Sequence, residues 1–395
     1  MFYVIGIFIS FFLGILLISK KRKTQADEIL ASWLVIMGIH LLLFYLSSII
    51  KNFPYPHLLG LEIPFPLLHG PFLYLYTAIM TNRLTGSKKT QILHFIPAVL
   101  SYLYLIQFYI LSANQKIIVY EHKGAGYETF LLLNSLATFI SGIVYVSWST
   151  ILLNRHKQSI LNQFSSTEKI NLNWLRYLIY GIGIIWIIVI FGDEKETFFA
   201  AVLFVLFIGY FGIKQVGIFT NVKPLTLPIK SETENPIQST QEEKEIYVEE
   251  TSSIENELIQ EIGIEKKKYL KSGLSKEAAE NFHKLLSALM NEEKLFIESD
   301  LSLSDLAKQM NIHPNYLSQL INEKEGKSFY DYINTLRIEE FKKQIANPIN
   351  QKYTILAIAY ECGFNSKSSF NRYFKKITNL SPSEYLNKLK NTEKE

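Results

Sequence analysis

The chain has 395 residues, 48% of them hydrophobic, and a formal net charge of +4 at pH 7. This hydrophobic share and the positive mean hydropathy are high for a soluble protein, so we expect part of the chain to lie in a membrane. The single cysteine, Cys362, excludes an intramolecular disulfide framework and a four-cysteine zinc site, which favours a reducing compartment for the water-soluble part.

Charge divides the chain into two unequal parts. Residues 1–220 hold nearly all the long apolar runs, whereas residues 221–395 hold 27 of the 36 acidic residues and 24 of the 40 basic ones. A lipid-embedded part followed by a water-soluble part is therefore predicted. The expected divisions are a transmembrane domain over 1–219, an acidic flexible linker over 220–262, a helical lead-in over 263–298 and a helical domain over 299–395.

Seven near-continuous apolar stretches stand in the first part. Each approaches the ~20 residues that a helix needs to cross the ~30 Å hydrocarbon layer of a membrane. The first stretch lacks the basic start and the small-residue cleavage site of a signal peptide, so we interpret it as an anchor. We predict an all-α chain that begins with a seven-helix transmembrane bundle. The predicted spans are 2–19, 29–50, 58–80, 91–112, 129–153, 172–191 and 197–217.

Lys and Arg in the short loops predict the orientation of this bundle, because cytoplasmic loops carry an excess of them. The loops after the first, third and fifth stretches hold ten, namely Lys20, Lys21, Arg22, Lys23, Arg83, Lys88, Lys89, Arg155, Lys157 and Lys169. The alternate loops hold four, namely Lys51, Lys116, Lys123 and Lys195. The N-terminus is therefore expected outside, and seven spans bring everything after about residue 218 into the cytoplasm.

Three ionisable residues fall inside the predicted spans. Glu62 and His69 stand seven apart in the proline-rich third stretch and are expected to share one helical face, and His40 stands in the middle of the second stretch. Ionisable groups at membrane depth are unfavourable and usually face a bundle interior or a cavity. One hypothesis is a ligand-sensing or proton-sensing pocket formed by these three residues. The alternative, which we favour from the sequence, is hydrogen bonding between helices.

The segment over 220–262 has the composition of a chain that cannot bury a core. Residues 221–262 contain ten Glu against three Lys, with Ser, Thr, Gln and three Pro. As a random coil, this segment spans roughly 35 Å on average, so the domain behind it stays close to the membrane. The lead-in that follows carries apolar residues at helical spacing, at Leu270, Phe282, Leu285, Leu286 and Leu289.

A two-helix pattern begins at Ser302. Ser302 and Asp305, three residues apart, predict a capping box that starts one helix. Asn311 tolerates the left-handed conformation that lets the chain reverse. His313 and Pro314 suit the N-cap and the first position of a second helix, which is expected to end near residue 323. This arrangement is typical of a helix-turn-helix motif.

A related pattern recurs about 52 residues later in ILAIAYECGF, with one residue inserted in its turn. Between the two patterns, apolar residues predict one long helix over about 328–346, whose ~19 residues span about 28 Å. This length is near the ~34 Å pitch of DNA, so the second helix of each pattern can enter successive major grooves on one face. Two helix-turn-helix motifs on a rigid spacer are therefore predicted.

Residues 299–390 resemble the DNA-binding domain of the AraC family of bacterial transcription regulators. The resemblance is carried by LSLSDLAKQMNIHPNYLSQLINEKEGKSFYDYINTLRIEEFKK and by YTILAIAYECGFNSKSSFNRYFKKITNLSPSEYL, and it covers about a quarter of the chain. A membrane bundle followed by this domain resembles a subset of such regulators from Bacteroidetes. The sequence departs from the family pattern at Phe341, where a small residue is commoner, and at Asn311, where glycine is commoner.

Polar side chains that packing does not require are expected to contact DNA. On the first recognition helix these are uncharged and suit base edges, because Asn and Gln can form two hydrogen bonds with adenine; they are Asn315, Tyr316, Ser318, Gln319 and Asn322. On the second, the residues expected to face outward are Lys367, Ser368, Ser369, Asn371 and Arg372. By the resemblance, the family contact positions are Asn315, Ser318, Gln319, Lys367, Ser369, Asn371 and Arg372.

Charge around the two motifs is uneven. Residues 362–390 carry six basic residues against Glu384 alone, so phosphate attraction is expected mainly on the second motif and sequence choice mainly on the first. Competition of the acidic linker with DNA phosphate for this surface is a further hypothesis, although most acidic runs are simply solvated.

No metalloprotease, serine-hydrolase or nucleotide-binding motif occurs in the sequence, so neither an enzyme nor a cofactor or metal site is predicted. Cys362 stands at an apolar position of the second motif and is interpreted as a packed thiol rather than a reactive one. His283 is assigned to the lead-in helix, because no glycine-rich phosphate loop follows it.

These features predict a one-component regulator in the bacterial cytoplasmic membrane, whose membrane domain senses an unknown signal and whose C-terminal domain binds promoter DNA. The expected partners are promoter DNA, the lipid bilayer and the signal, with a homodimer as an option. One alternative is a membrane receptor or transporter whose helical tail is a protein-interaction module. Another is a regulator that acts only after proteolytic release, which the linker permits.

Overall fold

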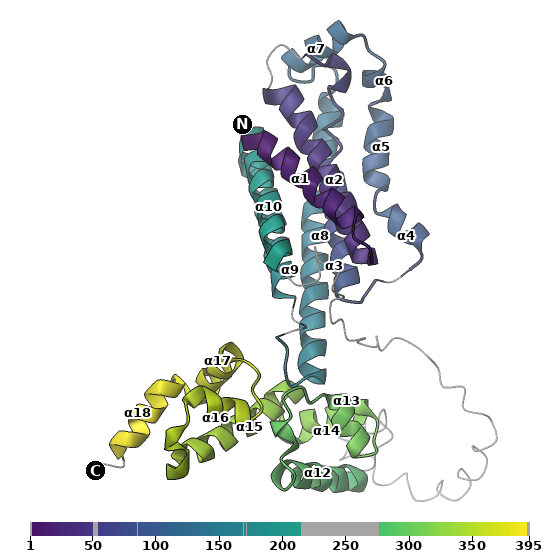
Figure 1. Cartoon of the computed structure of the whole chain (residues 1–395). Helices are drawn as coiled ribbons and strands as arrows, with labels where there is room; N and C mark the ends of the chain where they lie inside the picture. The colour runs from purple at the N-terminus through teal and green to yellow at the C-terminus, as the bar shows by residue number, and fades with distance from the viewer. Residues whose placement is uncertain are drawn as a thin grey trace, which may run out of the picture. The chain divides into compact units, whose positions relative to one another are not determined.

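The computed structural model describes residues 2–49, 54–84, 86–168, 170, 172–214 and 276–392. All regular structure in these residues is helical, apart from one isolated antiparallel bridge between Phe164 and Ser302. The chain divides into two compact units: the first joins residues 1–156 to 172–231, and the second joins residues 157–171 to 232–395 (Figure 1). The predicted all-α fold is thus confirmed where the structure describes the chain, and the predicted linker over 220–262 lies outside the described residues.

Long helices form the body of the first unit. They are α1 (Phe2–Ile18), α2 (Gln25–Phe44), α3 (Pro66–Met80), α8 (Glu128–Gln163), α9 (Asn173–Phe191) and α10 (Glu194–Lys214). A π-helical turn (Tyr45–Ile49) and a 3-10 helix (Pro56–Leu58) follow α2. Between α3 and α8 the chain forms the shorter helices α4 (Lys88–Leu93), α5 (Ile96–Tyr104), α6 (Ile106–Tyr109) and α7 (Ala113–Glu121).

Membrane-length helices are fewer than the sequence predicted. Three described helices are long and apolar enough to cross a membrane: α2 with its extension to Ser47, α8 and α9. α1 is apolar but has only 17 residues. The predicted bundle of seven spans is therefore supported only in part.

The predicted third span, 58–80, is not a continuous helix. Regular helix begins only at Pro66, and Glu62 lies in the turns before it, so the expectation that Glu62 and His69 share a helical face is wrong. Proline has no amide hydrogen and clashes with a preceding helical turn, so Pro64 and Pro66 delay the start of the helix.

The predicted fourth span, 91–112, is also interrupted. It is divided among α4, α5 and α6, with breaks at His94–Phe95 and at Leu105. Pro97 occupies the first turn of α5, where a proline is compatible with a helix start but not with a helix interior.

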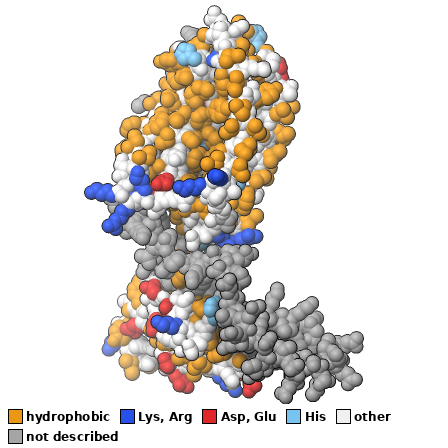
Figure 2. Space-filling view, turned by 90° about the vertical axis from the view of Figure 1, so that its right-hand side faces the viewer, with side chains coloured by type: hydrophobic (Ala, Val, Ile, Leu, Met, Phe, Trp, Pro, Cys, Tyr) orange, Lys and Arg blue, Asp and Glu red, His pale blue; other side chains and the backbone are white. Residues whose placement is uncertain are grey.

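Apolar side chains occupy both the inside and the outside of the first unit. Trp33, Leu73 and Val205 belong to its main core, which collects residues of α1, α2, α3, α9 and α10. Many other large apolar side chains remain exposed, including Leu132 and Phe191, the latter 84% exposed. Figure 2 shows that hydrophobic side chains cover most of the visible face of the bundle. So large an apolar exterior is unusual for a soluble monomer and indicates a surface covered by lipid or by partners.

The second unit contains two helix-turn-helix lobes joined by one long helix (Figure 1). The first lobe comprises α12 (Lys276–Asn291), α13 (Leu303–Gln309) and α14 (Pro314–Glu325). α15 (Phe329–Ala346) is the connecting helix. The second lobe comprises α16 (Ile355–Glu361), α17 (Lys367–Thr378) and α18 (Pro382–Thr392). Short 3-10 helices lie at Leu295–Ile297 and Pro348–Lys352.

Each lobe has its own core. Leu306, Leu317 and Ile333 belong to the mainly aliphatic core of the first lobe. The core of the second lobe is largely aromatic and includes Phe341 and Phe374. The lead-in helix α12 is part of the first core, to which it contributes Ala279, Leu286 and Met290, whereas Leu285 is exposed and Leu270 lies outside the described residues.

Candidate functional site

The first helix-turn-helix turn has the capping that its sequence predicts. Ser302 caps α13, and its hydroxyl oxygen accepts from the Asp305 amide while the Asp305 carboxylate accepts from the Ser302 amide. Asn311 adopts the left-handed conformation, with φ of 54°. His313 Nδ1 accepts from the Asn315 amide at 3.2 Å, and Pro314 takes the first position of α14. These contacts fix the angle at which α14 leaves the turn.

α14 presents a polar surface without Lys or Arg over its first two turns. Asn315, Tyr316 and Asn322 are exposed, and Ser318 and Gln319 are partly exposed. The opposite face, with Leu317, Leu320 and Ile321, is buried in the core of the first lobe. Gln319 Nε2 donates to Glu323 Oε1 at 3.0 Å, which orients the amide of Gln319 along the helix.

The second turn requires glycine. Gly363 has φ of 93°, and a Cβ atom there would lie 2.6 Å from the carbonyl oxygen of Ile297. Thr354 caps α16, and Ser366 caps α17 by accepting from the Ser369 amide at 3.1 Å. The close approach at Gly363 places the turn between α16 and α17 against the 3-10 helix Leu295–Ile297 of the first lobe.

α17 carries the basic side of the surface. Lys367, Ser368, Asn371 and Arg372 are exposed, as the sequence predicts. Ser369 differs from the prediction, because it is 6% exposed and does not face outward. Its position in the first turn, beside the capping hydroxyl of Ser366, turns its side chain toward the core of the lobe.

α15 sets the spacing of the two lobes. Its 18 residues correspond to about 27 Å of helix. Arg337, in the middle of this helix, is 1% exposed, and its guanidinium donates to the carbonyl oxygens of Phe296 and Glu298, both at 2.7 Å. Burial lowers the pKa of Arg337 to about 10, which leaves the side chain charged at neutral pH. The buried arginine therefore links α15 to the chain between α12 and α13.

Cys362 is a packed thiol. It is 1% exposed within the core of the second lobe. Burial, with smaller effects of Glu340 and Glu361, raises the pKa of this thiol to about 12. The thiolate required for nucleophilic or redox chemistry is therefore scarce at neutral pH.

One set of contacts was not predicted from the sequence. Residues 164–168, which continue α8, lie against the helix-turn-helix lobes within the second unit. Ser165 is 1% exposed, and its amide and hydroxyl both donate to the carbonyl oxygen of Leu301, at 3.2 and 2.6 Å. A short polar segment between two apolar stretches carries no periodic signal, so sequence patterns do not reveal such a contact.

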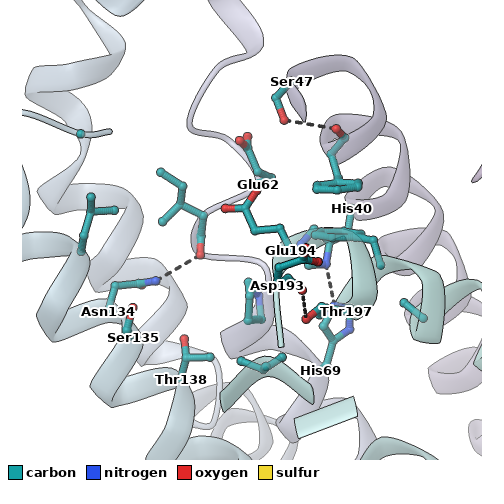
Figure 3. A pocket seen from close by; sticks show the side chains of 18 of the residues that line it. His40, Ser47, Glu62, His69, Asn134, Ser135, Thr138, Asp193, Glu194 and Thr197 are labelled. Carbon is teal, nitrogen blue, oxygen red and sulfur yellow. Dashed lines mark hydrogen bonds between the residues drawn. The ribbon is translucent and has the colours of Figure 1, made fainter. Parts of the chain in front are cut away.

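The first unit contains a cavity of about 910 Å³. Its wall is mostly apolar, with polar groups gathered in a few places (Figure 3). His40, Glu62 and His69, which the sequence singled out, all line it. The other labelled polar residues of the wall are Ser47, Asn134, Ser135, Thr138, Asp193, Glu194 and Thr197.

The two histidines of the cavity belong to one hydrogen-bonded chain. Trp33 Nε1 donates to His69 Nδ1 at 3.2 Å, and His69 Nε2 lies 2.9 Å from His40 Nδ1. Because Trp33 can only donate, Nδ1 of His69 is an acceptor, and a neutral His69 carries its proton on Nε2. His40 then accepts at Nδ1 and holds its own proton on Nε2. Hydrogen bonding between helices, the favoured alternative, is thus present within the cavity wall.

Two polar atoms of the cavity wall have no hydrogen-bond partner among the described residues. The Tyr120 hydroxyl donates to Glu62 Oε1 at 2.5 Å, but Oε2 of the same carboxyl group is buried without a partner. Thr138 is 5% exposed, and its hydroxyl is also unpartnered. Buried polar groups are seldom left unsatisfied, so a water or another small molecule in the cavity is expected to complete the hydrogen bonding of these two atoms. No group of three or more metal-ligating side chains occurs in the described part of the chain.

Comparison with known proteins concerns the second unit. Residues 306–388 match a family model described as a helix-turn-helix domain, and this range contains α14, α15, α16 and α17 with parts of α13 and α18. No solved structure gave a significant match. Residues 306–388 are thus similar to helix-turn-helix domains, which agrees with the resemblance of this part of the sequence.

The matching relatives are described as transcription regulators. An uncharacterized HTH-type transcriptional regulator of Staphylococcus aureus (strain COL) is 36% identical over 92 residues, which are 23% of this chain and 12% of the relative. The uncharacterized HTH-type transcriptional regulator YobQ of Bacillus subtilis (strain 168) is 35% identical over 89 residues, which are 22% of this chain and 36% of YobQ. The chain thus matches at most about a third of the length of these relatives.

Proposed function

We propose that the protein is a membrane-tethered transcription regulator that binds promoter DNA through α14 and α17. The observation that carries this proposal is the pair of capped helix-turn-helix lobes on one rigid connecting helix, in a region that matches a helix-turn-helix family. α14 and α17 each expose a polar face opposite a buried one. Side chains of this kind read base edges and contact phosphates in the major groove.

The charge of the two helices suits α14 to base recognition and α17 to phosphate contacts. α14 offers Asn315, Ser318 and Gln319 for base recognition, and its basic residue, Lys324, lies in its last turn. α17 offers Lys367 and Arg372, which attract the phosphate backbone irrespective of sequence. Accordingly, the first lobe selects the sequence and the second supplies most of the salt-sensitive affinity.

A place in the bacterial cytoplasmic membrane is supported by the first unit. Three of its helices reach membrane length, and large apolar side chains cover its exterior. Lys20–Lys23 lie between α1 and α2, and Arg83 follows α3, as expected for the cytoplasmic side. In this orientation the N-terminus is outside and the helix-turn-helix domain is in the cytoplasm.

A direct test captures DNA with the full-length protein in lipid nanodiscs. Sheared genomic DNA of the host is incubated with the nanodiscs, and the retained fragments are sequenced. We expect a small set of promoter fragments, lost on combining Gln319→Ala with Arg372→Ala. Retention without sequence preference, or no retention, would contradict the proposal and favour a receptor or transporter with a protein-binding tail.

Proteolytic release is tested separately in cells. Immunoblotting of membrane and soluble fractions is expected to detect only the full-length chain, in membranes that resist an alkaline wash. A shorter soluble fragment that contains the helix-turn-helix domain would instead establish a regulator that acts after cleavage.

We further propose that the cavity of the first unit is the sensing site. Glu62, Asp193 and Glu194 contribute three carboxylates to its wall against the single ammonium group of Lys123. Together with the unpartnered oxygens of Glu62 and Thr138, this composition suits an amphipathic ligand with a hydrogen-bond-donating cationic head and an apolar body.

Thermal unfolding of the protein in nanodiscs tests this ligand class, with decylamine and decanoate as probes. Decylamine is expected to raise the unfolding temperature and decanoate is not. The decylamine effect should disappear in Glu62→Gln and persist in Glu28→Gln, which removes an exposed carboxylate outside the cavity wall. Equal responses to both probes, or equal responses of the two variants, would refute the assignment.

A further inference from the structure

The segment Phe164–Glu168 is bound to the helix-turn-helix lobes by a continuous set of polar contacts. Phe164 forms the antiparallel bridge with Ser302, at the cap of α13. The Ser165 carbonyl oxygen accepts from Asn334 Nδ2 at 2.9 Å and from Arg337 Nη1 at 3.4 Å. The Ser165 hydroxyl accepts from Arg337 Nη2 at 3.2 Å. The segment therefore binds at the middle of α15, between the two lobes.

This contact satisfies buried groups of the connecting helix. Asn334 and Arg337 are each 1% exposed, and no carboxylate forms a salt bridge with Arg337 among the described residues. Hydrogen bonds from a buried guanidinium to backbone and hydroxyl oxygens are favourable only when most of its N–H groups are used. Ser165 supplies two of the acceptors, so the buried surface of α15 is complementary to this segment.

The same segment reaches the start of the second recognition helix. Asn365 Nδ2 donates to the Ser166 hydroxyl at 2.8 Å. The Glu168 carboxylate accepts from the hydroxyl of Ser366, which caps α17, and from the hydroxyl of Ser368 at 3.3 Å. An anion thus lies against the N-terminus of the helix that carries Lys367 and Arg372.

Helix N-termini attract anions, because their amide groups and the helix dipole present a positive potential. Phosphate groups of DNA bind at such positions on recognition helices. A carboxylate has the charge and the acceptor oxygens of a phosphate, so Glu168 and a DNA phosphate require the same place on α17.

We propose that the segment Phe164–Glu168 is an intramolecular competitor of DNA, which occupies the start of α17 when the segment is docked and leaves it free when the segment is released. This inference rests on the proposed DNA-binding function. The segment directly continues α8 and precedes α9, so a shift of either helix moves Glu168. Release of the segment by such a shift is the step that links the bundle to DNA binding.

The size of the effect follows from the docked population. If DNA binds only the undocked form, the observed dissociation constant is the intrinsic one divided by the undocked fraction. A variant in which the segment docks more weakly is therefore expected to bind DNA more tightly. The largest possible gain in affinity equals one divided by the undocked fraction of the unmodified chain. For an undocked fraction of about one tenth to one third, the expected gain is about three- to tenfold.

The first test compares full-length variants in nanodiscs on a DNA fragment that the unmodified protein retains. Glu168→Gln is expected to bind this fragment about three- to tenfold more tightly than the unmodified chain. The matched control is Glu361→Gln, which removes an equal charge from an exposed position at the end of α16. Equal affinity of Glu168→Gln and the unmodified chain, or an equal gain in both variants, would overturn the proposal.

A second test holds the segment in place. Ser166→Cys combined with Asn365→Cys allows a disulfide between two positions that are hydrogen-bonded in the structure. Oxidation is expected to abolish DNA retention, and a reductant is expected to restore it. Failure to crosslink, or unchanged retention after crosslinking, would refute the docked state. If neither the unmodified chain nor any variant binds a specific fragment, the proposed DNA-binding function is wrong. If the unmodified chain and all variants bind the fragment with equal affinity, only the proposed competition is wrong.

Discussion

In the two helix-turn-helix lobes the second helix begins with the same kind of N-cap, but the side chains that the two lobes expose differ in charge. In each, a residue just before the second helix caps it, His313 for α14 and Ser366 for α17. The charges at the end of α14 are engaged within the first lobe, where Lys324 pairs with Glu280 at 2.6 Å and Glu325 with His283 at 2.8 Å. The first two turns of α14 thus expose only uncharged polar groups.

In the second lobe the cationic side chains remain on the surface. Lys367 and Arg372 are exposed on α17, and Lys376 pairs with Asp331 of the connecting helix at 2.5 Å. Its aromatic core is covered in part by side chains of α18. Under the proposed function, the first motif serves base recognition and its repeat serves phosphate attraction and control.

The largest expected effect is a loss of stability that is confined to the core of the second lobe. Phe341 is fully buried and packs on Phe370 and Phe374, with ring centroids 4.7 and 5.5 Å away. Phe341→Ala should destabilise the second lobe by about 3–5 kcal/mol, because it leaves a cavity that the neighbouring rings cannot fill. Hydrogen exchange is expected to lose protection in α16 and α17 while α13 and α14 keep it. Uniform loss across both lobes would show that the two cores unfold as one.

A smaller effect is expected from base recognition by the first lobe. Gln319→Ala should weaken binding to the best DNA fragment by about 1–3 kcal/mol and relax the preference at one base position. Selection from randomised DNA measures both changes. Lys367→Ala is the matched variant in the second lobe and should leave the base preference unchanged. A relaxed preference in Lys367→Ala, with none in Gln319→Ala, would reverse the roles assigned to the lobes.

Acid should affect the second lobe through Asp331. Burial by itself would raise the pKa of Asp331, but hydrogen bonds from Lys376, Ser328 and Tyr373 lower it below its ordinary range. The folded state therefore gains stability from the ionised carboxylate above about pH 4, and this gain is lost as pH falls through the lowered pKa. We expect a loss of about 1 kcal/mol, measured by urea unfolding. Asp331→Asn should remove this part of the pH dependence; an unchanged profile would argue against the pairing.

The smallest expected effect is a change in how strongly DNA affinity depends on salt concentration. Lys367→Ala should reduce the slope of log affinity against log salt concentration by about 1, and weaken binding similarly on all sequences. Asn315→Ala in the first lobe should leave the slope unchanged. The slopes come from titrations of one DNA fragment at several salt concentrations. An equal reduction in both variants would mean that phosphate contacts are shared evenly by the lobes.

Local features of the second unit were predictable from sequence because they depend on neighbouring residues. The Ser302–Asp305 capping box, the left-handed Asn311 and the start of α14 at Pro314 each involve contacts within a few residues. The burial of Ser369 was not predicted, because the outward faces of α17 were assigned from polarity alone. The docking of Ser165 on Arg337 joins residues 172 apart and leaves no local pattern.

In the first unit, apolar composition predicted where helices lie but not where they break. Hydropathy averages over the chain, whereas Pro64, Pro66 and Pro97 determine where helical hydrogen bonding can start. His40, Glu62 and His69 line one cavity, although Glu62 reaches it from a turn rather than from a helix, and their role in sensing stays a prediction. Tertiary packing, rather than helical spacing, brings these residues together.

The most direct test of the central claim is genome-wide DNA occupancy of the full-length protein in its own host, beside the variant with Gln319→Ala and Arg372→Ala. We expect discrete promoter peaks that share one sequence motif, are recovered from crosslinked membranes and are lost in the variant. Peaks that persist in the variant, or an absence of peaks while the intact protein is in the membrane, would contradict a tethered regulator that reads DNA through α14 and α17.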